Sequence, residues 1–295
     1  MNLKVVVPLA SPGLSMLPAS KSVPWEMLPL ADMPFIQYLI NEIASAGFRD
    51  VIFISHADKY PVRDHFDLSY ELESQLEQKN KFSLLSLVRR LCPQGMSITC
   101  VTDHGYLGDG HALIRAKSAI GDAPFIVVLP RFLMVAEENC QLKNGLSDLA
   151  DRFTFTGRNQ LQVIKTDSTE ETQHFRTIIT SKTLDTSGDT ALITGIASCA
   201  EGAKSSIIST GRFVLTPHVW DVLEKTQPNA YGEVTLFDAL CELVKAENSD
   251  AVLTEDRCYD CASKIGYMKA FVEYSLRHSD EGMKLRQIIM GKLSG

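Results

Sequence analysis

The chain lacks an excess of positive charge and has no long apolar run. Its 29 Lys and Arg are outnumbered by 36 Asp and Glu, which gives a formal net charge of −7. A general nucleic-acid binder normally carries a basic stripe, so this balance argues against nucleic acid as a partner. No apolar run approaches the ~18 residues of a membrane span, and the apolar start of the chain is interrupted by Pro8. We therefore expect neither a signal peptide nor a membrane partner.

The cysteines also lack the pattern of a disulfide framework. There are 7, an odd number, and most lie in apolar patterns such as Leu240-Cys241-Glu242-Leu243. This usage is typical of reduced, buried thiols and predicts a cytoplasmic location. Cys258 and Cys261 form a CxxC, but a zinc site needs a second pair, and a redox motif is expected near the start of a thioredoxin-like unit. We interpret this CxxC as a coincidence.

What the sequence does contain is an alternation of apolar strand and helix patterns. A chain of 295 residues buries about three quarters of its unfolded surface on folding, so its core needs no metal. Buried strands are expected at 3–9, 51–55, 97–101, 125–129, 161–164, 176–180 and 207–215, and helices at 35–43, 74–91, 111–119, 234–246, 264–278 and 283–293. This order predicts an α/β fold with a Rossmann-like, mixed but mainly parallel sheet flanked by helices. Without a linker or repeat, we expect a single domain over 1–295.

Loops at the carboxyl ends of these strands are the candidate site, because ligands bind there in open α/β sheets. They are 10–21, 103–111, 130–132 and the loop around Asp260. The first loop is rich in small residues and ends in Lys21, so its backbone N–H groups can approach a phosphate. It does not match a P-loop, and a plain strand-to-helix connection explains it equally well.

Four motifs, in chain order, make the sequence recognisable. They are Leu17-Pro18-Ala19-Ser20-Lys21, Glu26-Met27-Leu28-Pro29, Gly108-x-Gly110-His111-Ala112 and Asp260-Cys261-x-x-Lys264-x-Gly266-Tyr267. With these motifs the chain resembles the bacterial UTP–glucose-1-phosphate uridylyltransferase family from about residue 5 to 283. The resemblance implies a nucleotidyltransferase-type fold, Mg²⁺ as the cofactor, and formation of UDP-glucose and pyrophosphate from UTP and glucose-1-phosphate. Such chemistry depends on positioning and charge stabilisation.

The resemblance also assigns roles to single positions. Asp103 stands where the family has a Gln that reads uracil, and a carboxylate can accept hydrogen bonds but cannot donate one. Asp260 matches a metal-binding Asp. The other matching positions are the family's active-site Lys at Lys21 and nucleotide- or sugar-binding positions at Ala10, Gly13, Glu26, Gly108 and Gly110.

The phosphate loop departs from the family's pattern. The family has Gly-x-Gly-Thr-Arg where this chain has Ser11, Pro12, Gly13, Leu14 and Ser15. One glycine remains, the Arg is absent, and Pro12 has no N–H to donate. The loop is therefore expected to hold a triphosphate poorly.

The metal side departs further. Arg131 replaces the family's Mg²⁺-binding Asp, and the stretch 196–198 lacks the Glu-Lys pair that grips the sugar phosphate. Losing one charge-stabilising group slows such chemistry by about 10²–10³-fold. We predict a degenerate-site paralogue with weak or no activity, which regulates sugar-nucleotide metabolism through mixed or homo-oligomers. We also expect the Arg131 fork to pair bidentately with Asp260 and to make the cleft indifferent to Mg²⁺, the alternative being an Arg131 turned into solvent.

Two other functions stay open. One is an active but divergent uridylyltransferase in which another residue, for example Asp109, supplies the metal ligand. The other is a binding module unrelated to the family's substrates. The partners expected from the resemblance are UTP, UDP-glucose or another sugar nucleotide, a second copy of the chain in a dimer or tetramer, and an active uridylyltransferase in a mixed oligomer. The stripe Tyr267, Ala270, Phe271, Tyr274 and Leu276 is either an oligomer surface or part of the chain's own core.

Overall fold

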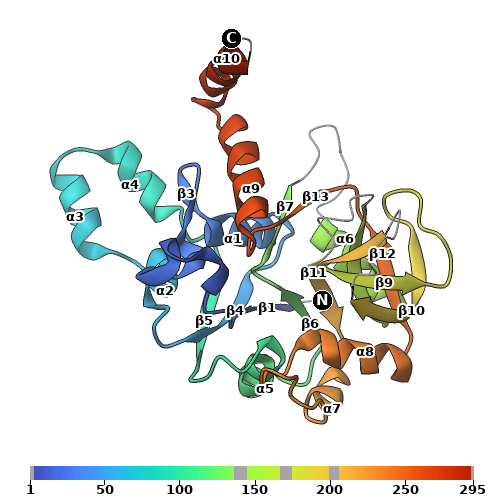
Figure 1. Ribbon diagram of the computed structural model, residues 1–295. Coiled ribbons are helices and arrows are strands. Elements are labelled where there is room, and N and C mark those ends of the chain that lie inside the picture. Colours follow the sequence, from blue (N-terminus) through green and yellow to red (C-terminus); the bar gives the residue numbers. More distant parts are fainter. Residues whose placement is uncertain (1–2, 136–144, 167–174, 199–205, 294–295) are drawn as a thin grey trace.

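A single nine-stranded sheet forms the centre of the computed structural model, which describes residues 3–135, 145–166, 175–198 and 206–293 (Figure 1). The strand order is β5(Ser97–Asp103)-β4(Asp50–His56)-β1(Lys4–Leu9)-β6(Phe125–Val128)-β11(Ser206–Leu215)-β8(Asn159–Thr166)-β12(Ser249–Leu253)-β10(Thr190–Ser198)-β9(Arg176–Thr180). Strands β5, β4, β1 and β6 are parallel to one another, as are β8 and β12, whereas β11 runs antiparallel between the two groups. The predicted mixed sheet is confirmed.

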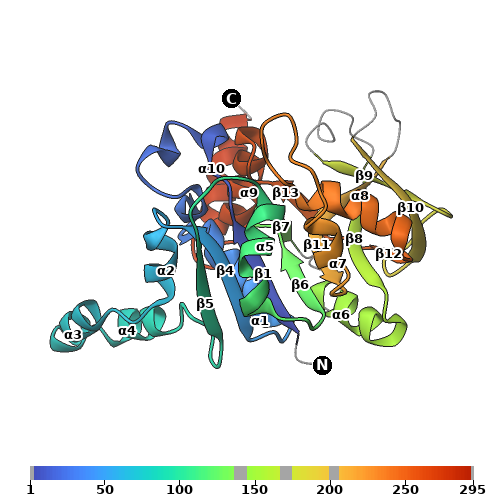
Figure 2. The same cartoon turned by 90° about the horizontal axis from the view of Figure 1, so that it is seen from below.

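Helices cover both faces of this sheet. Val5 and Val7 of β1 pack with α1(Phe35–Ser45) and α6(Gly145–Thr156), whereas Val6 packs on the side of α5(Asp109–Ile120), α7(Val219–Leu223) and α8(Leu236–Ala246). Figure 1 shows α5, α7 and α8 together below the sheet, and Figure 2 brings them to the front. Strands buried on both faces need apolar side chains at every position, which explains the unbroken β-branched runs.

A two-stranded antiparallel sheet and the helix that follows it lie at the carboxyl ends of the parallel strands. β7(Phe132–Val135) pairs antiparallel with β13(Arg257–Asp260), and Phe132 lies opposite Asp260. Because of this register, the residue before β7 meets the end of β13. Under α9(Lys264–Leu276), a separate apolar cluster contains Met16, Trp25, Leu30, Phe35, Leu133, Cys261 and Ala270.

This cluster decides between the two expectations for the stripe on α9. Ala270 is fully buried, and Tyr267 and Tyr274 pack against the cluster. Phe271 is exposed. Tyr267, Ala270 and Tyr274 therefore belong to the chain's own core, whereas an oligomer contact at the exposed Phe271 stays a prediction.

Two parts of the chain project from the body. The helical region expected at 74–91 is a pair, α3(Tyr70–Gln78) and α4(Phe82–Arg89), with Asn80 between them at a φ of 53°. This helix pair follows α2(Tyr60–Phe66) and forms the first projection (Figure 1). The second projection is α10(Gly282–Leu293), which continues beyond α9. None of the described helices has the length and apolar character needed to cross a membrane. The short hairpin β2(Pro29–Leu30) and β3(Met33–Pro34) precedes α1.

The cysteines that the structure describes are free thiols: Cys92, Cys100, Cys241, Cys258 and Cys261. Cys140 and Cys199 lie outside the described residues. Burial raises the pKa of the Cys258 thiol to about 12 and raises the pKa of Cys261 well above its ordinary value. A reactive CxxC needs a lowered pKa, so these two thiols are inert.

Candidate functional site

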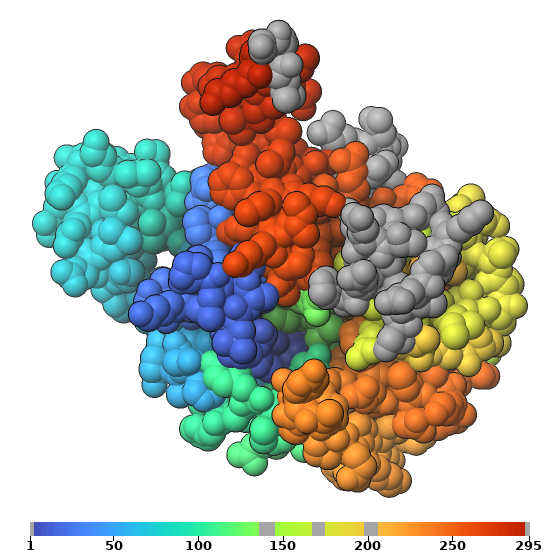
Figure 3. All heavy atoms as spheres, in the orientation of Figure 1, coloured from blue at the N-terminus to red at the C-terminus, as the bar shows by residue number. Residues whose placement is uncertain are grey.

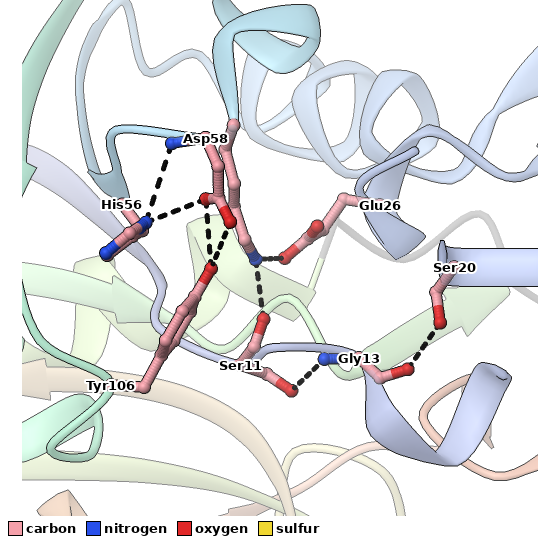
Figure 4. Close-up of polar contacts among 8 residues, drawn as sticks. Ser11, Gly13, Ser20, Glu26, His56, Asp58 and Tyr106 are labelled. Atoms are coloured by element: carbon pink, nitrogen blue, oxygen red, sulfur yellow. Dashed lines mark hydrogen bonds and ion pairs between the residues drawn. The ribbon is translucent and has the colours of Figure 1, made fainter. Parts of the chain in front are cut away.

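The loop after β1 forms one wall of a hollow on the face drawn in Figure 3, where the blue N-terminal segment meets the green and orange segments. It contains three short 3₁₀ turns, η1(Leu14–Met16), η2(Ala19–Lys21) and η3(Trp25–Met27). Its own polar groups hold it: the Gly13 N–H donates to Ser11 Oγ at 3.2 Å, and Ser20 Oγ donates to the Gly13 carbonyl at 2.7 Å (Figure 4). The loop is thus shaped without a ligand.

Gly13 is required at this position for two reasons. Its φ is 68°, in the left-handed region, and a Cβ atom would lie 2.8 Å from the Trp25 ring. Because the Gly13 N–H already donates to Ser11, it is not aimed at a phosphate in this arrangement. The phosphate-binding role of Gly13 therefore stays a prediction.

A buried ion pair anchors the same loop to the start of α2(Tyr60–Phe66), just after β4. Lys59 is 4% exposed, and its Nζ atom lies 2.5 Å from Oε1 of the fully buried Glu26 and 2.7 Å from the Ser11 carbonyl. Burial raises the pKa of Glu26, and the neighbouring Lys59 opposes that rise only in part. The structure therefore makes Glu26 an anchor of the loop. Lys59 was missed by the sequence analysis, since nothing in the motifs marks it.

A second cluster ties the loop after β5 to β4. His56 Nδ1 lies 2.9 Å from Asp58 Oδ1, and the Tyr106 hydroxyl lies 2.9 Å from both Asp58 oxygens (Figure 4). The His56 and Tyr106 rings stack with centroids 4.5 Å apart. Burial favours a higher pKa for Asp58, but the hydrogen bonds from His56 and Tyr106 outweigh it and lower that pKa. Asp58 is therefore held as a carboxylate and orders this wall of the hollow.

Asp103 and His111 contribute unpartnered polar atoms. Asp103 ends β5 and is 5% exposed, and its Oδ2 atom lies 3.5 Å from His111 Nδ1. Among the described residues, neither of these two buried atoms has a hydrogen-bond partner. Buried polar atoms are normally hydrogen-bonded, so these two atoms, which face each other at a strand end without a hydrogen bond, are suited to a ligand. The assignment of Asp103 to base recognition stays a prediction.

Gly108 and Gly110 have a packing role in the structure. Gly108 has a φ of 98°, and a Cβ there would lie 2.4 Å from the Val234 carbonyl oxygen. The Gly110 N–H donates to the same oxygen at 3.0 Å. Between them, Asp109 Oδ1 accepts from the Leu236 N–H at 2.8 Å. The two glycines let this loop dock on the start of α8, and Asp109 is an anchor for that helix and not the substitute metal ligand considered above.

Arg131 and Asp260 form the predicted bidentate pair. Nε lies 2.7 Å from Oδ1 and Nη2 lies 2.7 Å from Oδ2. Asp260 is 6% exposed and Arg131 is 37% exposed. Asp260 Oδ1 also accepts from the Ala262 N–H at 3.1 Å. The expectation of a paired Arg131 is confirmed, and the alternative of a fully solvent-directed side chain was wrong.

This pair leaves no place for a divalent cation at Asp260. Mg²⁺ prefers carboxylate and other oxygen ligands, but both Asp260 oxygens are occupied by a guanidinium that carries a positive charge. Within the described ranges, no group of three or more His, Cys, Asp or Glu side chains is placed to hold a metal. The residues present do not fit the family's Mg²⁺ in this arrangement.

A buried arginine supports the corner that carries Arg131. Arg212 of β11 has no exposed surface, and its Nη1 donates to the Phe132 carbonyl at 2.8 Å. Its Nε and Nη2 lie 2.9 and 2.5 Å from the carboxylate of Glu42 on α1. Since Phe132 directly follows Arg131, this second ion pair fixes the backbone next to the first.

The remaining predicted residues occupy different places. Lys21 is exposed at the end of η2, and no described residue pairs with its ammonium group. Ala10 is half-buried and packs on the core. Ser15 Oγ donates to the Ala262 carbonyl at 2.5 Å, which joins the first loop to the Asp260 loop. Ala197 lies in β10 opposite Thr177 of β9, at the far edge of the sheet.

The Arg131–Asp260 pair has a testable energetic consequence. Replacing Asp260 with Ala should lower the free energy of unfolding by about 1–2 kcal/mol, because Arg131 then loses its partner but keeps access to water. Chemical denaturation measures the effect. Glu224→Ala, which removes a partner of Lys117 on the surface, is the matched control and should leave the midpoint unchanged. An Asp260→Ala midpoint equal to that of the parent chain would show that the pair contributes nothing.

The comparisons with known proteins agree with this fold. Residues 12–278 match the family model of nucleotidyl transferases. Over 296 residues, the chain is 42% identical to the UTP–glucose-1-phosphate uridylyltransferase of Escherichia coli K12, covering 99% of each chain. Its fold matches a UTP-bound UGPase from Acinetobacter baumannii with a TM-score of 0.89 and 32% identity, covering 98% of this chain and 99% of that one. A UDP-glucose pyrophosphorylase complexed with UDP-glucose matches with a TM-score of 0.80 and 26% identity, covering 94% and 100%.

The fold and the matched residues define a nucleotidyltransferase. More narrowly, the chain belongs to the UTP–glucose-1-phosphate uridylyltransferase family.

Proposed function

We propose that this protein binds a sugar nucleotide of its family, UTP or UDP-glucose, and turns it over weakly or not at all. The observation that supports the proposal is the Arg131–Asp260 pair, which occupies both oxygens of the carboxylate that matches the family's metal ligand. A reaction that transfers a nucleotidyl group depends on cations placed at the phosphates. Without the metal, the protein keeps a binding cleft but lacks the main source of charge stabilisation.

The first loop supports the same proposal. Leu14 is 69% exposed and stands where the family has a hydroxyl, and Ser15 is bonded to the Ala262 carbonyl in place of an Arg. Neither side chain can neutralise phosphate charge. On these grounds we place the chain in a degenerate-site branch of the family.

An active uridylyltransferase is the second candidate, and the comparisons favour it more directly. The relatives at 42% identity are named as UTP–glucose-1-phosphate uridylyltransferases over nearly their whole length. Their names say nothing of an inactive branch. The two candidates make the same prediction for ligand binding and opposite predictions for turnover.

Calorimetric titration tests the shared part of both candidates. UTP and UDP-glucose should bind with one site per chain, whereas an unrelated nucleoside such as adenosine should not compete. Absence of binding by both uridine compounds, at protein concentrations in the tens of micromolar, would remove the proposed function and leave a module unrelated to these substrates.

We further propose that residues 1–295 act as one domain in the cytoplasm and assemble as a homodimer or homotetramer, or with an active uridylyltransferase. Exposed apolar residues that are not part of the core stripe, among them Met268 and Val272 on α9 and Phe82 on α4, are available for such contacts. Light scattering at micromolar concentration should give two or four times the chain mass. A monomer mass at that concentration would overturn the homo-oligomer, and co-purification with an active relative tests the mixed one.

A further inference from the structure

We infer that Arg131 recognises the diphosphate of the bound sugar nucleotide directly, so that the cleft binds its ligand without a divalent cation. This inference rests on the proposed function, because it concerns how that same ligand is held. Arg131 occupies the carboxylate that matches the family's metal ligand, and in this arrangement Arg131 itself contacts the diphosphate.

The first observation is how the guanidinium is used. Asp260 engages only Nε and Nη2, and Nη1 has no partner among the described residues. The side chain keeps 37% of its surface exposed. A guanidinium has five N–H donors, so the pair with Asp260 leaves donors available for an anion. The two hydrogen bonds to Asp260 fix the orientation of the Arg131 guanidinium.

The second observation is that the backbone at Arg131 is held on both sides and that its guanidinium has an aromatic neighbour. Cys261 donates its N–H to the Arg131 carbonyl at 2.9 Å, and Arg212 fixes the next residue through the Phe132 carbonyl at 2.8 Å. The Arg131 guanidinium also lies over the Phe132 ring, 5.4 Å from its centroid. An arginine held in this way loses little freedom on binding, which favours recognition of a planar pair of phosphate oxygens.

The third observation is the balance of charge around the hollow. Glu26 is paired with Lys59, Asp58 with His56 and Tyr106, and Asp260 with Arg131. Asp103 faces His111.

On the cationic side, the ammonium of Lys21 and the outer amino group of Arg131 remain without a described partner. Ser15 Oγ joins the loop that carries Lys21 to Ala262, two residues after the Asp260 that pairs with Arg131. Open cations beside carboxylates that already have partners are suited to a phosphate group.

The test measures the dissociation constant for UDP-glucose by calorimetry, in EDTA and in excess Mg²⁺. For the parent chain we expect the two values to agree within about twofold. Arg131→Gln should weaken binding by about 10–100-fold in EDTA, the usual effect of losing a hydrogen bond to a charged group. Arg131→Lys, which keeps the charge but not the fork, should lie between them. Arg90→Gln, on the projecting α4 end, is the matched charge control and should bind like the parent chain.

The outcomes separate the two claims. If the parent chain binds UDP-glucose only with Mg²⁺, or if Arg131→Gln binds as tightly as the parent, this inference is overturned while the proposed function stands. If the parent chain binds UTP but binds UDP-glucose in neither condition, this inference is again overturned while the proposed function stands. If it binds neither compound, the proposed function itself fails. Circular dichroism of each variant checks that it is folded. Inorganic pyrophosphate, which has no base or sugar, serves as a second probe, and Arg131→Gln should weaken its binding as well.

Discussion

Purified protein should make UDP-glucose from UTP and glucose-1-phosphate at least about 10³-fold more slowly than the Escherichia coli enzyme assayed beside it. Removing one charge-stabilising group from such a site lowers the rate by about 10²–10³-fold, and this chain departs from the family at the metal position and in the phosphate loop. Effects within one site are not additive, but they act in the same direction. Pyrophosphate release with excess Mg²⁺ measures the rate.

Restoring the metal ligand alone should not restore this activity. Arg131→Asp removes the guanidinium from Asp260, but Leu14 and Ser15 still leave the loop without its cation. We expect the variant to gain a response to Mg²⁺ in a thermal-shift assay and to remain far below the enzyme in rate. Turnover of the parent chain within tenfold of the Escherichia coli enzyme would instead establish the active, divergent candidate.

The largest stability effect is expected at the pair beneath the site. Glu42→Ala should lower the free energy of unfolding by about 3–5 kcal/mol, because it leaves the fully buried Arg212 without its carboxylate. Denaturant unfolding followed by circular dichroism measures the loss. Glu42→Gln keeps an acceptor for one of the two N–H groups and should cost less.

An exposed ion pair on the surface provides the control for Glu42→Ala. Glu77 pairs with Arg89 on the projecting α3 and α4 helices, where both side chains are about half exposed. Glu77→Ala should leave the unfolding midpoint where it is, since exposed pairs contribute little. If Glu42→Ala and Glu77→Ala lowered the free energy of unfolding equally, the burial of Arg212 would not increase the contribution of its ion pair to stability.

The parallel core could be predicted from the sequence because its strands are unbroken apolar runs. β1, β4 and β6 are buried on both faces along their central residues, which are all apolar, so the pattern is plain. β12 was missed because it begins with Ser249 and Asp250, whose polar side chains are buried in the sheet. β13 was missed because its four residues carry two charges and depend on a partner strand more than 100 residues earlier in the chain.

The site was predictable only where a motif or a resemblance marked it. Asp260 and Arg131 lie 129 residues apart, and the pairing of β7 with β13, which brings them together, has no local signal. Arg212 could have been found, because a charged residue inside an apolar strand must be paired when buried. Lys59 carried no such signal, since it lies beyond the end of β4.

The role of the two glycines in the loop after β5 could not be predicted from the sequence. Gly108 and Gly110 match positions that bind ligand in the family, yet here the backbone of Val234 occupies the space that a Cβ would fill. A glycine required for packing and a glycine required for a phosphate look the same in a sequence. In the folded chain the Gly110 N–H donates to the Val234 carbonyl, which marks a packing role.

Anomalous diffraction from a crystal grown with UDP-glucose and Mn²⁺, as a visible substitute for Mg²⁺, tests most directly whether Arg131 has displaced the metal. We expect UDP-glucose in the hollow, the Arg131 fork within hydrogen-bond distance of Asp260, and no Mn²⁺ signal at that carboxylate. A Mn²⁺ ion bound to Asp260 with Arg131 turned away would contradict it.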